Sequence, residues 1–169
     1  VGRAQAIQAL ALVWLFNLLS YGIAPPAPGA SLGRYAVLLA AATSVFLRSR
    51  YREAPGLLPP SIGWTLALGL FLVVHSLLFS QLPEISILKA ISWTLAMATL
   101  IAAWSGLTIP KRDRLARQLL MAMILVLVVS LPLLASPLGY LRNGSGFQGV
   151  LSHPQAFGAF AALLCAWGV

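Results

Sequence analysis

The fold is decided by residues 61–82, which read SIGWTLALGLFLVVHSLLFSQL. This run contains no Asp, Glu, Lys or Arg, and it has the length of about 20 residues that a helix needs to cross a bilayer. Five further apolar runs flank it, at 6–24, 32–47, 85–107, 115–136 and 154–169. We therefore predict an all-α protein, a single polytopic bundle of about six transmembrane helices.

The composition excludes a water-soluble domain. Of the 169 residues, 60% are apolar and 8% are charged, whereas a soluble domain carries roughly a quarter charged residues. The net charge of +8 can indicate nucleic-acid binding. Because the cations gather in short segments between apolar runs, we expect anionic lipid as the partner and no nucleic acid. The single cysteine, Cys165, lies in an apolar run and can form no intramolecular disulfide.

The basic segments 48–53 and 111–117 are expected to be polar loops between successive helices, and Pro132 is expected to kink or end the fifth helix. If the spans alternate in direction, three of the 11 basic residues fall on one side of the membrane: Arg34, Lys89 and Arg142. The other eight fall on the side of the N-terminus: Arg3, Arg48, Arg50, Arg52, Lys111, Arg112, Arg114 and Arg117. Because cytoplasmic loops carry an excess of Lys and Arg, we predict a cytoplasmic N-terminus and an external loop at 139–152.

The sequence excludes several kinds of chemistry. The three acidic residues, Glu53, Glu84 and Asp113, all lie outside the predicted spans, so a proton relay of intramembrane carboxylates is not expected. No Gly-rich phosphate loop, nucleophile elbow or cluster of metal ligands occurs. His75 lies within the run at 61–82, and we expect it to bond a neighbouring helix rather than to act in a site.

The segment with the most chemistry is 141–158, which reads LRNGSGFQGVLSHPQAFG. It combines the cation Arg142 and the imidazole of His153 with Pro154, a residue that suits the first turn of a helix. Unpaired N–H groups at a helix start attract anions, and an arginine can hold phosphate oxygens with two hydrogen bonds. The same residues equally fit a plain loop, in which Arg142 anchors to headgroups, glycines form turns and His153 caps a helix.

This segment resembles the O-antigen ligase and O-antigen polymerase superfamily of bacterial membrane proteins at six positions: Arg142, Gly149, His153, Pro154, Gln155 and Gly158. Gln155 stands where the family usually has Asn. The resemblance implies a metal-independent, cofactor-free glycosyltransferase of the bacterial inner membrane. Such enzymes take glycan from an undecaprenyl-pyrophosphate carrier on the periplasmic side. It also implies that this chain is the N-terminal part of a longer protein and lacks the family's C-terminal catalytic loop.

By this analogy, Arg142, His153 and Gln155 are candidate contacts to the lipid pyrophosphate. The predicted topology adds Lys89 and Arg34 as further external cations, although both also fit as anchors that reach for the membrane interface. Two other functions stay open. One is transport of an anion such as inorganic carbon, since proteins of the same superfamily are proposed to do so, and the other is a non-catalytic membrane subunit.

Overall fold

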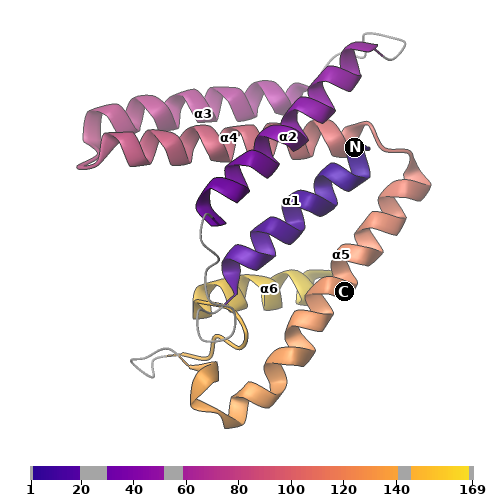
Figure 1. Ribbon diagram of the computed structural model, residues 1–169, viewed down its shortest axis with the longest axis vertical. Helices are drawn as coiled ribbons and strands as arrows, with labels where there is room; N and C mark the ends of the chain where they lie inside the picture. The colour runs from indigo at the N-terminus through magenta and orange to yellow at the C-terminus, as the bar shows by residue number, and fades with distance from the viewer. Residues whose placement is uncertain (1, 20–29, 52–58, 141–145, 168–169) are drawn as a thin grey trace. The chain divides into compact units, whose positions relative to one another are not determined.

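The computed structural model describes residues 2–19, 30–51, 59–140 and 146–167 (Figure 1). Contacts divide the chain into two compact units. The first unit comprises Val1–Val13 and Ser31–Thr108, and the second comprises Trp14–Ala30 and Ile109–Val169. The helices are α1 (Arg3–Leu18), α2 (Ala30–Tyr51), α3 (Pro60–Phe79), α4 (Pro83–Ser105), α5 (Ile109–Ser130), the 3₁₀ turns η1 (Leu131–Ala135) and η2 (Pro137–Gly139), and α6 (Pro154–Trp167).

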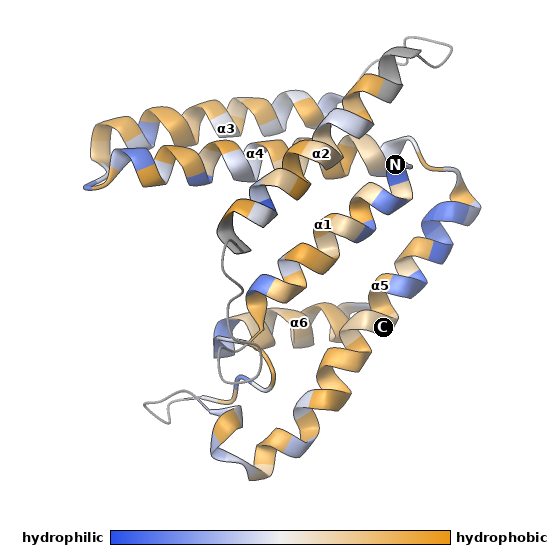
Figure 2. Cartoon of the chain, in the orientation of Figure 1, coloured by the Kyte–Doolittle hydropathy of each residue, from blue (hydrophilic) through white to orange (hydrophobic). Residues whose placement is uncertain are grey.

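The all-α class is confirmed for the described residues, and three helical segments are long and apolar enough to cross a membrane. These are α3, α4 and the continuous stretch Ile109–Ala135 of α5 and η1. The apolar parts of α2 (Leu32–Leu47) and α6 are shorter. The long helices expose large apolar side chains, among them Trp64 and Phe79, and Figure 2 shows hydrophobic residues covering them. Such a surface indicates a membrane protein, because lipid can cover it and water cannot.

The helices α3 and α4 form a hairpin with a short connection. Pro83 occupies the first turn of α4, where a missing N–H is tolerated, and the Ser80 hydroxyl both lies 2.7 Å from the Ser86 hydroxyl and accepts from the Leu82 amide. Midway along the hairpin, a Cβ on the buried Gly69 would overlap a side chain of α4, so the two backbones approach closely there. The spans predicted at 61–82 and 85–107 are thereby confirmed as helices to within three residues at each end.

His75 lies four residues before the end of α3, which is about 6 Å of helical rise. Its ring packs between Phe71 and Phe79, with centroids 5.9 and 5.0 Å away. The expected hydrogen bond from His75 to a neighbouring helix is not found among the described residues. If α3 crosses the membrane, a position so near the helix end would bring the imidazole close to the interface, where it needs no such bond.

The two predicted polar loops are wrong where the structure describes them. Residues 48–51 continue α2, and residues 111–117 form the first turns of α5, where Figure 2 shows hydrophilic residues gathering. Neither segment contains glycine or proline, and Lys, Arg, Leu and Ala all favour helix. Pro110 lies in the first turn, where it does no harm. The helices therefore continue past the apolar residues, and the fifth begins at Ile109 rather than at residue 115.

The end of α5 confirms the role predicted for Pro132. The α-helix stops at Ser130, and a 3₁₀ turn follows because proline cannot supply the next helical N–H. The sixth helix begins at Pro154 as predicted. The first begins at Arg3 rather than at residue 6 and runs to Leu18, and residues 20–29 lie outside the described part.

Within the first unit, α1 meets the end of α4. The guanidinium of Arg3 lies directly against Gly106, the residue that caps the C-terminus of α4. A cation is favourable there because the last carbonyls of a helix carry partial negative charge. The start of α1 and the end of α4 therefore lie at the same end of this unit (Figure 1).

Candidate functional site

The candidate site is the loop between η2 and α6, in the second unit. The residues described there are closed into a neck by a β-bridge between Tyr140 and Phe147. The amides of Gln148 and Gly149 both donate to the Gly139 carbonyl, at 2.8 and 3.3 Å. The Tyr140 hydroxyl donates to the Leu134 carbonyl at 3.2 Å. The base of the loop is thus held by hydrogen bonds to two backbone carbonyls, those of Gly139 and Leu134.

Ser130, at the end of α5, anchors this loop. Its side chain is fully buried, donates to the Val126 carbonyl at 2.7 Å and accepts from the Val150 amide at 3.1 Å. Gly149 lies against it with φ of 59°, the only glycine with positive φ among those described. A Cβ on Gly149 would overlap Ser130 and lie 3.2 Å from the Phe157 ring. Both backbone conformation and space therefore require glycine at this motif position.

The loop also packs on an apolar cluster of the second unit. Leu151 is fully buried, and it forms this cluster with the buried side chains of Val126, Val150 and Phe160. The Ser152 amide donates to the Leu18 carbonyl at 2.7 Å, which ties the loop to the end of α1. Three helices of this unit therefore hold the loop in place: α1, α5 and α6.

The start of α6 presents two of the predicted site residues. The His153 carbonyl accepts from the amides of Ala156 and Phe157, at 3.1 and 3.3 Å, so His153 caps the helix through its backbone. Its imidazole and the Gln155 carboxamide are exposed and free to meet a ligand. Gly158 is also exposed, and a Cβ there would meet nothing within 4 Å. Gly158, unlike Gly149, is therefore not required by the packing of the described residues.

The other predicted site residues lie outside the described part of the chain or in the first unit. Arg142 lies outside the described residues. Lys89 is exposed near the start of α4, in the first unit. Arg34, also in the first unit, stacks on its neighbour Tyr35, with the guanidinium carbon 4.7 Å from the ring centroid and a 3.0 Å bond to the hydroxyl. This pair is typical of an interfacial anchor, and a place for Lys89 and Arg34 beside the loop stays a prediction.

Sequence reasoning missed Gln148. The residue is only 6% exposed, and its Oε1 has no hydrogen-bond partner among the described residues. A buried polar oxygen without a partner costs about 1–3 kcal/mol, so such an atom calls for an explanation. No spacing in the sequence distinguishes it from other loop residues, because its burial arises only when the chain folds.

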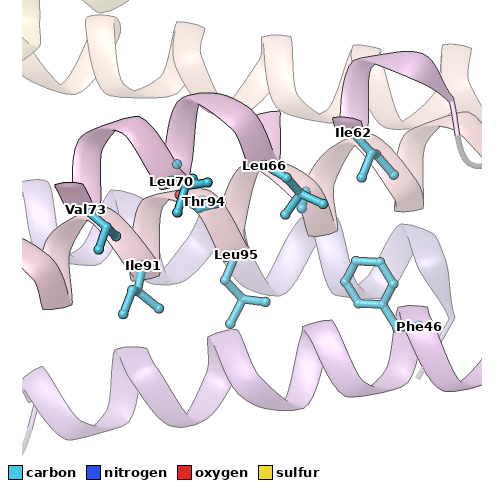
Figure 3. Close-up of a pocket in the computed structure, with 10 residues that line it drawn as sticks. Phe46, Ile62, Leu66, Leu70, Val73, Ile91, Thr94 and Leu95 are labelled. Atoms are coloured by element: carbon cyan, nitrogen blue, oxygen red, sulfur yellow. The ribbon is translucent and has the colours of Figure 1, made fainter. Parts of the chain in front are cut away.

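The first unit contains an open apolar pocket of about 510 Å³, lined by side chains of α2, α3 and α4 (Figure 3). Phe46 of α2 faces Leu66 of α3 and Leu95 of α4 across it. The polar lining atom, the Thr94 hydroxyl, already donates to the Ala90 carbonyl at 2.7 Å. This lining can hold a hydrocarbon chain, but it offers no group for acid, base or nucleophilic chemistry.

No group of three or more His, Cys, Asp or Glu residues that could hold a metal ion occurs within the described residues. No protein-family model, curated protein or solved structure matches the chain. The chemistry of the site must therefore be argued from its own residues. The second unit offers a loop with a hydrogen-bonded base, a helix start with an exposed imidazole and carboxamide, and one buried acceptor that has no donor among the described residues.

Proposed function

We propose that this chain holds an undecaprenyl-pyrophosphate-linked glycan at the external loop of its second unit, as part of a glycosyltransferase resembling O-antigen ligases and polymerases. The observation that carries the proposal is the packing of Gly149 against Ser130. The resemblance requires glycine at this position, and the fold independently leaves no room for a Cβ. The described part of the loop is thus packed against α5 at the glycine that the resemblance picks out.

The chemistry of the loop suits a pyrophosphate. The start of α6 carries partial positive charge, and the exposed imidazole of His153 and carboxamide of Gln155 can donate hydrogen bonds beside it. Arg142 follows the neck of the loop in sequence and would supply a charged fork for phosphate oxygens. In this proposal Arg142 neutralises the charge of the pyrophosphate, and His153 and Gln155 at the start of α6 orient the headgroup.

The proposal includes a topology of six spans in the inner membrane of a bacterium, with the N-terminus in the cytoplasm. The contact between Arg3 and Gly106 supports it, because four successive crossings bring the start of α1 and the end of α4 to one side. The proposed topology puts the first turns of α5 on the same side of the membrane, and Lys111, Arg114 and Arg117 are exposed on these turns. Their charges would contact the anionic headgroups of the cytoplasmic leaflet.

Cysteine labelling tests this topology. In a Cys165→Ser background, a cysteine is placed at His153 or at Arg114, and intact cells receive a maleimide that cannot cross the membrane. We expect labelling at 153 only, with 114 labelled after the cells are opened. Labelling of 114 in intact cells would reverse the proposed orientation.

Binding of the carrier tests the function. The chain is placed in nanodiscs, and its affinity for undecaprenyl pyrophosphate is measured by native mass spectrometry. Arg142→Ala should bind roughly 10- to 100-fold more weakly, as expected for the loss of a hydrogen bond to a charged group. The matched control Arg114→Ala should bind like the parent. Equal affinity of the Arg142→Ala variant and the parent would refute the proposed contact between Arg142 and the pyrophosphate. Absence of binding, together with bicarbonate uptake into liposomes, would favour the transporter instead.

A further inference from the structure

The buried carboxamide of Gln148 points to a ligand contact that the resemblance does not contain. Its main chain is fixed on both sides, since the Gln148 amide donates to Gly139 at 2.8 Å and its carbonyl accepts from Leu151 at 3.1 Å. The side chain is more than nine-tenths buried, and Oε1 has no partner among the described residues. The main chain of Gln148 is thus held in place, while its side-chain oxygen has no donor among the described residues.

Two other polar groups that hold the described part of the loop already have partners. The Ser130 hydroxyl is used twice, by the Val126 carbonyl and the Val150 amide. The Gly139 carbonyl accepts two amides. A buried carboxamide is expensive to desolvate, and an apolar side chain of similar length would avoid that cost. An acceptor kept there despite the cost is best explained by a donor that arrives with a ligand.

The acceptor atom determines which part of the ligand can bind to it, because that part must donate a hydrogen bond. A pyrophosphate diester has no hydrogen to donate at neutral pH, so it cannot satisfy Oε1. The hydroxyl groups of a sugar can. We infer that Gln148 Oε1 accepts a hydrogen bond from a hydroxyl of the sugar attached to the pyrophosphate, and so distinguishes a glycan-loaded carrier from an empty one. This inference rests on the proposed function, because it places the same lipid carrier at the same loop.

The test compares two probes on the chain in nanodiscs: undecaprenyl pyrophosphate, and undecaprenyl pyrophosphate carrying one N-acetylglucosamine. The parent should bind the sugar-bearing lipid about five- to tenfold more tightly, as one additional hydrogen bond allows. Gln148→Met, which keeps the length of the side chain and removes the acceptor, should lose this preference and bind the bare carrier as the parent does. Gln81→Met, at an exposed glutamine of the first unit, should keep the preference.

A second measurement separates ligand recognition from a structural role. If Oε1 has a hydrogen-bond donor only when the ligand is bound, Gln148→Met without lipid should unfold at the same temperature as the parent or higher, because a buried unpaired oxygen has been removed. A lower unfolding temperature, or a preference for the sugar-bearing lipid that survives in Gln148→Met, overturns the inference. Failure of the parent to bind either probe would instead refute the proposed function, on which the inference rests.

Discussion

Replacement of Gly149 by alanine should destabilise the loop between η2 and α6, and the structure allows the size of the effect to be worked out. Gly149 has φ of 59°, and an L-residue in this left-handed region costs about 1–2 kcal/mol relative to glycine. The added Cβ would also overlap the Ser130 side chain and crowd Phe157. Overpacking of a well-filled site costs about 1–3 kcal/mol. The two effects together predict a loss of about 2–5 kcal/mol.

The assay is thermal unfolding of the purified chain in detergent, and the chain provides its own control. Gly158 is the other glycine of the motif that lies within the described part, and a Cβ there meets nothing within 4 Å. Because Gly158 lies inside α6, alanine should stabilise it by about 0.5–1 kcal/mol. Gly149→Ala should therefore unfold at a clearly lower temperature and Gly158→Ala at an equal or higher one. Identical unfolding of Gly149→Ala and the parent would refute the packing of the loop on α5.

Two further substitutions test the packing elsewhere in the chain. Ser130→Ala should lower the free energy of unfolding by about 1–3 kcal/mol, because it leaves the buried Val150 amide unpaired. The control Ser92→Ala loses only a bond to its own helix and should change stability by less than about 0.5 kcal/mol. Equal effects of the two substitutions in thermal unfolding would argue against Ser130 as the anchor of the loop. Gly69→Ala should lower the free energy of unfolding by about 1–3 kcal/mol, because the added Cβ overlaps a side chain of α4. Gly63→Ala, in the same helix with open space around it, should not destabilise the protein. A Gly69→Ala variant as stable as the parent would contradict the close approach of α3 and α4.

The helices themselves were largely predictable from the sequence. Apolar runs of about 20 residues leave few alternatives in a membrane, and prolines mark the starts of α3, α4 and α6. Pro132 likewise marks the end of α5. The basic residues led to two wrongly predicted loops. Hydropathy indicates where a helix leaves the lipid, but it does not indicate where the helix ends. Residues 111–117 are charged and still helical, since nothing in them breaks a helix.

The site was predictable only in part. Gly149, His153 and Pro154 stood out as residue types with special roles, and the structure places them at a turn with left-handed backbone and at a helix start. Ser130 and Gln148 did not stand out. Each is a common polar residue whose importance depends on burial by segments distant in sequence, and single-sequence patterns do not report such contacts.

The account depends most directly on where the lipid headgroup binds. A photoreactive undecaprenyl-pyrophosphate analogue, with the reactive group beside the phosphates, should be cross-linked to the chain in nanodiscs and the labelled peptides sequenced. We expect the label within residues 139–158, and competition by unlabelled undecaprenyl pyrophosphate should remove it. Label confined to the basic turns at 111–117, or spread evenly along the helices, would contradict a carrier site at the external loop.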